Sequence, residues 1–156
     1  MSPLATRSGS RPHTPPSNPH TQLDQQPSDP RLAIELAERI FALPGVVECP
    51  RRISVPGARA LTLAPGEPVG PPEAFLIAHE FAHLHPEPDR SLHAMLPPDI
   101  VAQAIAADWA ELHPVARIGL IPDTAVMIYA PRNDAELDIV EQLVRASHAF
   151  ARPSTP

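Results

Sequence analysis

The sequence lacks lysine altogether, and it contains a single cysteine, Cys49, in 156 residues. Without lysine the chain cannot form a Schiff base with a carbonyl substrate, anchor pyridoxal phosphate or supply the lysine of a phosphate-binding P-loop. One cysteine excludes an internal disulfide and any metal site built from several cysteines. What the composition offers for chemistry is histidine, which occurs eight times, six of them at or after His79.

Basic charge and long apolar runs are also scarce. The basic residues, all arginine, number 12 against 18 acidic ones, and the resulting net charge of −6 argues against a nucleic-acid partner. The longest apolar runs, such as 124–130, fall well short of the roughly 18 residues that a membrane-spanning helix needs. No apolar signal segment begins the chain. We therefore expect a cytoplasmic protein with no membrane segment, whose single thiol stays reduced.

Residues 1–28 differ in composition from the rest of the chain. They are rich in proline and serine, and they show no hydrophobic periodicity. Such a segment buries too little apolar surface to offset the entropy lost on ordering, so we predict a disordered leader in which His13 and His20 are solvated. The folded domain is predicted to span 29–152, and a short tail at 153–156 follows it.

Hydrophobic periodicity in the domain predicts three helices and several strands. The helices are predicted at 29–43, 98–110 and 133–152, and strands at 46–49, 59–63 and 124–130. Asp29 and Asn133 have the side chains that cap helix N-termini. With a hairpin in the histidine-rich stretch, this order predicts a single-domain α+β fold in which helices lie on one face of a mainly antiparallel sheet.

The histidine-rich stretch contains an HExxH pattern formed by His79, Glu80 and His83. This pattern binds zinc when a helix turns both imidazoles toward one metal and the glutamate activates a water. The extended metzincin pattern needs a glycine at the position of Pro86 and a third ligand at Asp89. Proline fixes φ near −65° and cannot make the turn that glycine permits. A zinc-dependent hydrolase therefore stays an alternative that requires a helix through HExxH.

The same stretch also fits a β-hairpin over 80–96, with a five-residue loop between its strands. Direct closure of that loop places His83 opposite His93. Because alternate residues of a strand share a face, Phe81 and His85 are expected on the same side of the sheet as these two histidines.

Three imidazoles on one face have three interpretations. Neutral histidines could hold Zn²⁺ or Fe²⁺ with coordination positions left open. Alternatively, they could take a proton from an acidic hydroxyl and stabilise the anion that remains. The third interpretation is that the rings are half-exposed on a sheet and bind nothing.

Four sequence elements, in the same order along the chain, resemble the luciferase-domain family. The family patterns are AHxHP, GSxH, GWxExHP and YxPR, and the matching residues are 82–86, 90–93, 108–114 and 129–132. The resemblance extends over about 30–152. Arg90 and Asp108 depart from it, because the family usually has glycine at both positions.

The resemblance implies that an enol of the hydroxypyrone type is oxygenated by O₂ without flavin, nicotinamide or metal. A histidine would remove the enol proton, and His83 or His93 is assigned as this base. His85, His113 and Arg132 would orient the substrate or stabilise its charge. The expected catalytic residues are His83, His85 and His93. The expected substrate-binding residues are Phe81, Trp109, His113, Tyr129 and Arg132.

Three classes of function remain open on the sequence. The favoured class is a luciferase-like oxidoreductase that acts on a small enol or phenol and needs no cofactor, with zinc or iron at the histidine cluster as the alternative. The second class is a zinc-dependent hydrolase that uses HExxH. The third is a non-catalytic domain that binds a small ligand or a partner protein.

Overall fold

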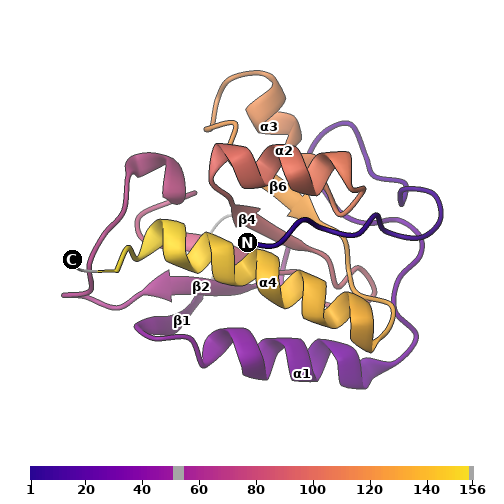
Figure 1. The fold of residues 1–156 in the computed structure, drawn as a ribbon, viewed down its shortest axis with the longest axis horizontal. Helices are drawn as coiled ribbons and strands as arrows, with labels where there is room; N and C mark the ends of the chain where they lie inside the picture. The colour runs from indigo at the N-terminus through magenta and orange to yellow at the C-terminus, as the bar shows by residue number, and fades with distance from the viewer. Residues whose placement is uncertain (51–54, 155–156) are drawn as a thin grey trace.

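The sheet at the centre of the fold has six antiparallel strands within the described residues, 1–50 and 55–154, of the computed structural model (Figure 1). In chain order the strands are β1 (Val46–Pro50), β2 (Arg59–Leu63), β3 (Glu80–Leu84), β4 (Leu92–Met95), β5 (Ala110–Leu112) and β6 (Ala125–Ile128). Their spatial order is β1-β2-β3-β4-β6-β5, and each neighbouring pair is antiparallel. The pair formed by β3 and β4 therefore lies at the middle of the sheet.

The helices are α1 (Pro30–Phe41), α2 (Pro98–Ala106), α3 (Pro114–Arg117) and α4 (Asp134–Ala151), and a 3-10 turn lies at η1 (Pro72–Ala74). The predicted caps are present. The Asp29 side chain accepts a hydrogen bond from the backbone N–H of Arg31, and Asn133 accepts one from Glu136, each at 2.9 Å. These contacts satisfy N–H groups that the first turn of a helix leaves unpaired. The α+β class with three substantial helices is confirmed.

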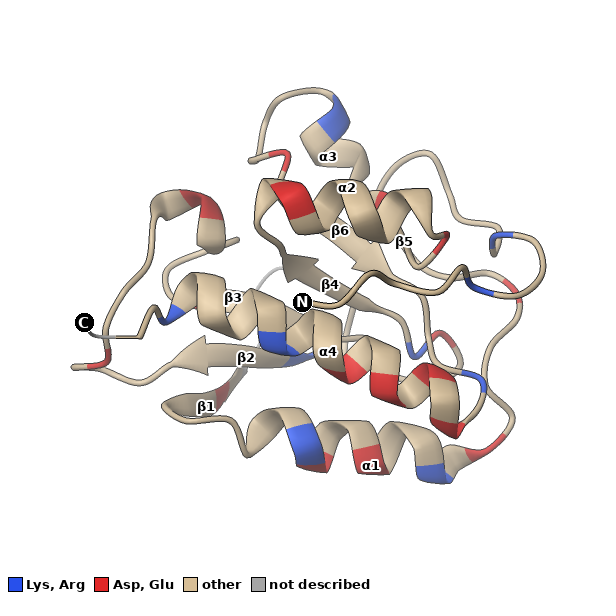
Figure 2. Ribbon diagram, viewed as in Figure 1, with Lys and Arg blue, Asp and Glu red and all other residues tan. Residues whose placement is uncertain are grey.

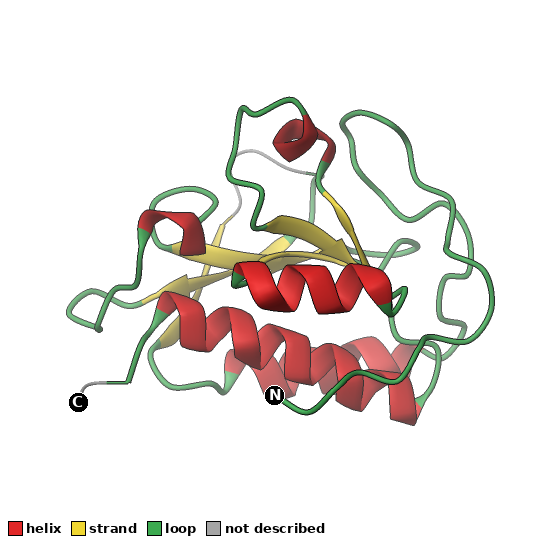
Figure 3. Ribbon diagram, turned by 45° about the horizontal axis from the view of Figure 1, so that its top comes forward, coloured by secondary structure: helices red, strands yellow, loops and turns green. Residues whose placement is uncertain are grey.

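One face of the sheet packs against α1, α2 and α4, as Figures 1 and 3 show. Leu92 and Ala94 of β4 belong to this core, together with Leu36 of α1 and Leu143 of α4. Each fully buried leucine contributes about 1.5–3 kcal/mol relative to an exposed one. The alternation of β4 therefore sends its intervening residue, His93, to the other face.

The opposite face of the sheet is covered only in part. Met95 and Ala125 form a small apolar cluster there with Ala116 of α3. The strands β4 and β6 contain no charged residue, and most of the acidic and basic residues lie on α1, α4 and the loops (Figure 2). This face is where β3 and β4 present their histidines.

The second predicted helix is shorter than the sequence indicated. It ends at Ala106, and Ala110–Leu112 instead form β5, which pairs with β6. Asp108 lies between them with a φ of 64°, in the left-handed region that terminates a helix. The prediction that the helix continued to residue 110 was wrong, because three residues are too few to show the alternation that identifies a strand.

Residues 1–28 have no helix or strand, but they pack against the domain (Figure 1). The Trp109 indole donates a hydrogen bond of 2.7 Å to the carbonyl of Ala5, and the backbone N–H of Gln22 donates one of 3.0 Å to Asp89. His20 is buried, so the prediction that it is solvated was wrong, whereas His13 is exposed. The predicted disorder of this segment is not confirmed. None of the helices in the described part of the chain combines the length and the apolarity that crossing a bilayer requires.

Candidate functional site

The histidine-rich stretch forms the predicted hairpin. The strands β3 and β4 pair with His83 opposite His93, and the backbone N–H of His85 donates to the carbonyl of Ser91 at 2.9 Å. Glu80 and His83 lie in a strand, so the helix that HExxH chemistry requires is not formed. His79 is exposed beside the ring of Phe75. The structure therefore gives no support to a zinc hydrolase of the HExxH type.

Phe81 departs from the predicted alternation. The pairing of β2 with β3 shifts between Leu61 and Thr62, which is the signature of a β-bulge. The bulge turns Phe81 to the helical face, where its ring lies 5.8 Å from that of His148, while Glu80 stays on the face of His83. The expectation that Phe81 shares a face with the histidines was wrong for this reason.

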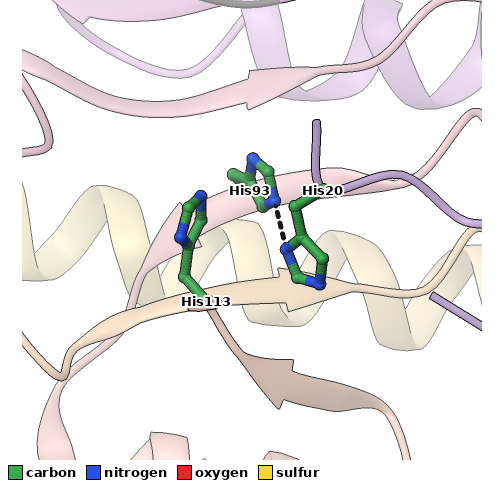
Figure 4. A group of neighbouring side chains, drawn as sticks. All are labelled: His20, His93 and His113. Atoms are coloured by element: carbon green, nitrogen blue, oxygen red, sulfur yellow. Dashed lines mark hydrogen bonds between the residues drawn. The ribbon is translucent and has the colours of Figure 1, made fainter. Parts of the chain in front are cut away.

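Five buried imidazoles gather on the face opposite the helices. They come from three separate parts of the chain and are His20, His83, His85, His93 and His113. The ring of His93 lies at their centre, 4.9 Å from the ring of His83, 4.6 Å from that of His85 and 4.5 Å from that of His113. Figure 4 shows the neighbouring side chains of His20, His93 and His113, with a hydrogen bond of 2.9 Å between His20 Nδ1 and His93 Nε2. The sequence found four of these rings and missed His20.

Carboxylates hold the two β3-hairpin histidines that flank His93. His83 Nδ1 lies 3.3 Å from Glu80 Oε2. His85 Nδ1 lies 3.0 Å from Ser91 Oγ, which itself donates to Asp89, and 2.8 Å from Asp89 Oδ2. Glu80 accepts from His83 Nδ1, and the Ser91 hydroxyl, whose own proton goes to Asp89, accepts from His85 Nδ1. The Nε2 atoms of both rings therefore carry the lone pair in the neutral state.

A third carboxylate, Glu111 of β5, holds His20. His20 Nε2 lies 2.9 Å from Glu111 Oε2, and the hydroxyls of Thr14 and Tyr129 also donate to this side chain. Burial would raise the pKa of Glu111, but the hydrogen bonds from His20, Thr14 and Tyr129 outweigh burial and lower it. An ionised Glu111 therefore holds His20, the histidine of residues 1–28 that lies in the cluster.

The Nδ1 atom of His113 accepts a hydrogen bond, whereas the Nδ1 atoms of His83 and His85 donate one. His113 is the N-cap of α3, and its Nδ1 accepts a hydrogen bond of 3.1 Å from the backbone N–H of Val115. A nitrogen that accepts such a bond has no proton, so the neutral ring carries its proton on Nε2. His113 is therefore a hydrogen-bond donor at Nε2, in contrast to His83 and His85.

Burial and charge act strongly on the centre of the cluster. Burial first, and then the positive charge that His83, His85, His113 and His20 would carry, lower the pKa of His93 well below its ordinary value. Burial would raise the pKa of Asp89, but its hydrogen bonds with His85, Ser91 and the Gln22 amide lower it. His93 is therefore neutral near pH 7, with ionised Asp89 and Glu111 at the edge of the cluster.

A cavity of about 720 Å³ opens above the imidazoles. All five rings line it, and its walls are mainly apolar, with contributions from Leu76, Val115 and Ile121. Pockets of roughly 300–1,000 Å³ with apolar walls and a few convergent polar groups are typical of small-molecule sites. The cavity is therefore a candidate site in which the imidazoles supply the polar groups.

The remaining predicted substrate-binding residues lie away from this cavity. Arg132 pairs with Glu136, its backbone N–H and its Nε each 2.9 Å from the same carboxylate oxygen. Trp109 is part of the helical core and donates to Ala5. Tyr129 reaches the cluster only through Glu111, at 2.9 Å. None of the three, nor Phe81, contributes to the described lining of the cavity.

The comparisons with known proteins agree with this site. The family model described as Luciferase domain matches residues 78–147, which include four of the five clustered histidines. Residues 78–147 match the luciferase-domain family. Fungal luciferases are among its relatives: those of Armillaria ostoyae, Armillaria mellea and Neonothopanus nambi are 33%, 32% and 31% identical to this chain over 102 residues.

The luciferase-domain resemblance covers only part of each protein. Each of these alignments covers 60% of this chain and 38% of the relative, so the chain matches well under half the length of the curated luciferases. No solved structure matches the chain. His20 lies outside the residues that the family model matches.

The two departures from the family pattern have a structural explanation. Arg90 has a φ of 61° and Asp108 a φ of 64°, so both occupy the left-handed region that glycine adopts without strain. The glycine that the resemblance implies at both positions would adopt this backbone without strain. The hairpin turn and the loop before β5 therefore adopt a left-handed conformation in this chain without glycine.

Proposed function

We propose that this protein is an oxidoreductase that binds a small enol- or phenol-like molecule in the histidine-lined cavity and catalyses its oxygenation by O₂. The observation that carries the proposal is the position of the imidazole cluster at the floor of an apolar cavity, in a chain whose residues 78–147 match the luciferase-domain family. Apolar walls suit a planar aromatic or pyrone ring, and the imidazoles suit its acidic hydroxyl.

The proposed reaction needs no organic cofactor, because the substrate anion itself is the reductant. The enol hydroxyl loses its proton to an imidazole of the cavity, which leaves an electron-rich anion. The carbon next to the former enol carbon then forms a bond to O₂, which is reduced to the peroxide level while the carbon is oxidised. The proton returns to the terminal oxygen, so that one substrate and one O₂ give one hydroperoxide. The assignment of the base to His83 or His93 stays a prediction.

Polar and apolar residues of the cavity would bind different parts of the substrate. His113 presents an Nε2–H that can donate to the oxygen on which negative charge develops, because its Nδ1 is occupied by the Val115 amide. Leu76 and Ile121 would enclose the ring and limit access of water to the anion. Arg132 is not part of this arrangement, since Glu136 engages its guanidinium and backbone.

The test is oxygen uptake by the purified protein with a panel of hydroxypyrones and acidic phenols. We expect uptake with at least one compound, and a loss of roughly 100-fold or more in His83→Gln and His93→Gln, the usual contribution of general acid–base catalysis. His79→Gln is the matched control, since this histidine is exposed and outside the cavity. Variants that retain full uptake would reject the roles of His83 and His93.

A non-catalytic role has a different signature in the same experiment. A protein that binds panel compounds in the cavity, with affinity that falls in His113→Gln, and yet consumes no O₂ with any of them would be a small-ligand-binding domain. That result would reject the oxygenase proposal while leaving the location of the site intact.

A further inference from the structure

A chain of four contacts at hydrogen-bond distance crosses the imidazole cluster from one carboxylate to another. The contacts are Glu80 Oε2 to His83 Nδ1 at 3.3 Å, His83 Nε2 to His93 Nδ1 at 3.1 Å, His93 Nε2 to His20 Nδ1 at 2.9 Å and His20 Nε2 to Glu111 Oε2 at 2.9 Å. Each contact needs one proton between its two atoms. Three neutral imidazoles carry three protons, and ionised carboxylates carry none. The four contacts therefore share three protons, and one contact has none.

The contact without a proton is one of the two that His93 makes. The outer rings must donate to their carboxylates, so His83 Nε2 and His20 Nδ1 are both lone pairs that face His93. Since neutral His93 has a single N–H, it can donate to only one of them, and its other contact becomes two lone pairs about 3 Å apart. An additional proton would fill this position, but it would place a positive charge on a buried ring that is packed against four other imidazoles. A metal ion fills the same position without protonating any ring.

We propose that His83, His85 and His93 bind a divalent first-row transition-metal ion at the floor of the cavity. Nitrogen atoms of these three buried rings lie within 4.8 Å of one another. Three histidines around one ion leave at least one coordination position open in a tetrahedral site. All three rings line the cavity, so an open position there is accessible to a small molecule.

A second group of three histidines is close enough to hold an ion, and the tautomers decide between the two. His20, His93 and His113 also have ring nitrogens within 4.8 Å of one another. However, His113 Nδ1 accepts the Val115 amide, so its Nε2 keeps its proton and has no lone pair for a metal. His85 is the reverse case, because its Nδ1 lies against Ser91 Oγ and Asp89 and its Nε2 lone pair is available. The ion is therefore assigned to the group that contains His85.

Each of the three ligands has an outer partner of the kind that metal-binding histidines require. A ligating histidine almost always donates its other ring N–H to a carboxylate, carbonyl or water, which fixes the ring and increases its basicity. His83 donates to Glu80, and His85 donates to the Ser91 hydroxyl, which Asp89 orients. His93 then donates from Nε2 to His20, which in turn donates to Glu111. Residues 1–28 thus complete the site through His20.

The ligand set also defines the class of ion. Three neutral imidazoles without a thiolate suit Zn²⁺, Fe²⁺ or Co²⁺, and they disfavour Mg²⁺ and Ca²⁺, which take oxygen ligands. The inference rests on the proposed function only for the role of the ion, which would hold the anionic oxygen of the substrate. It revises that function at one point: with the ion bound, the ring nitrogens of His83 and His93 that face each other are ligands and not bases. The ion would then acidify the enol hydroxyl in place of an imidazole, and the proton would leave to solvent. The inference departs from the family resemblance, which implies a reaction without metal.

The experiment uses the full chain, purified without a polyhistidine tag, stripped with a chelator and titrated with Zn²⁺ or Co²⁺ alone. We expect one ion per chain, with the visible absorption of a low-coordinate Co²⁺ site. His85→Gln and His93→Gln are expected to weaken Zn²⁺ binding by roughly 100-fold or more, and His20→Ala by roughly 10-fold to 100-fold, as for other outer-shell partners. His79→Gln and His113→Gln should bind within a few fold of wild type. Circular dichroism confirms that each variant is folded.

Three outcomes would overturn the inference. They are a folded wild-type protein that binds no ion, binding that is unchanged in His85→Gln, and binding that is lost in His113→Gln but kept in His85→Gln, which would move the ion to the rival group. Binding is measured without substrate, so the two proposals fail separately. A protein that binds the ion but consumes no O₂ contradicts the proposed function alone, and undiminished O₂ uptake by protein that binds no ion contradicts the metal site alone.

Discussion

Replacement of His20 by alanine tests whether residues 1–28 are part of the folded structure. The His20 side chain has 0% of its surface exposed. Both of its ring nitrogens are engaged, one with His93 and the other with Glu111, each at 2.9 Å. A disordered leader would leave this side chain in solvent, where its removal would have no effect on stability.

The magnitude of the His20→Ala effect follows from these two contacts. A hydrogen bond to a charged group contributes about 1.5–3 kcal/mol, and one between neutral groups about 0.5–1.5 kcal/mol. The variant also leaves His93 Nε2 and one oxygen of Glu111 without this partner. We therefore expect a loss of about 2–4 kcal/mol in the free energy of unfolding. For a chain of this size, 1 kcal/mol corresponds to about 2–4 °C, so the melting temperature should fall by roughly 4–16 °C.

The assay is urea and thermal unfolding of His20→Ala beside wild type and His13→Ala. His13 is a matched control in the same segment, because its side chain is 83% exposed. Hydrogen exchange at the Gln22 amide, which donates to Asp89 at 3.0 Å, gives a local measure of the same packing. Equal stability of His20→Ala and His13→Ala, with a Gln22 amide that exchanges as in an unfolded chain, would refute the packing described for residues 1–28.

Three further predictions concern positions outside the cluster. Gly70→Ala should destabilise the fold by about 2–3 kcal/mol in urea unfolding, because the new Cβ would lie 2.1 Å from the backbone carbonyl oxygen of Phe150; an unchanged midpoint would contradict this close approach. Arg90→Gly should raise stability by about 0.5–1 kcal/mol in thermal unfolding, since glycine relieves a φ of 61° at some cost in chain entropy, and a lower melting temperature would refute the strain. Burial would raise the pKa of Glu136, but hydrogen bonds with Arg132 lower it, so this pair stabilises the fold above about pH 4.3 and the contribution is lost as the pH falls through the lower folded-state value. Glu136→Gln should therefore lose less stability than wild type between about pH 5 and pH 3, and parallel acid unfolding curves would contradict the pairing.

The central hairpin could be predicted from the sequence because two local rules agree there. The alternation of β4 and the length of the loop together specify which histidines face each other, and the structure pairs His83 with His93 as expected. Helix caps and apolar periodicity likewise located α1 and α4, since both signals lie within a few residues of the helix that they define.

The rest of the site depends on contacts between distant parts of the chain. His20 reaches His93 across 73 positions of sequence, and nothing in the composition of residues 1–28 indicates that contact. The bulge that turns Phe81 toward α4 arises from pairing with β2, which the sequence of β3 alone does not specify. Arg132 was expected in the site from the family pattern, but Glu136, one helical turn away, pairs with it instead.

Oxygenation of a small enol or phenol in the imidazole-lined cavity is the reaction proposed for this protein. Its most direct test is mass spectrometry of the product formed under isotopically labelled O₂, with the panel compound that gives the fastest uptake. We predict that wild type and His79→Gln incorporate oxygen from O₂, and that His93→Gln incorporates none above the level without protein. Label that enters from water instead of O₂, or equal incorporation by His93→Gln, would contradict the claim.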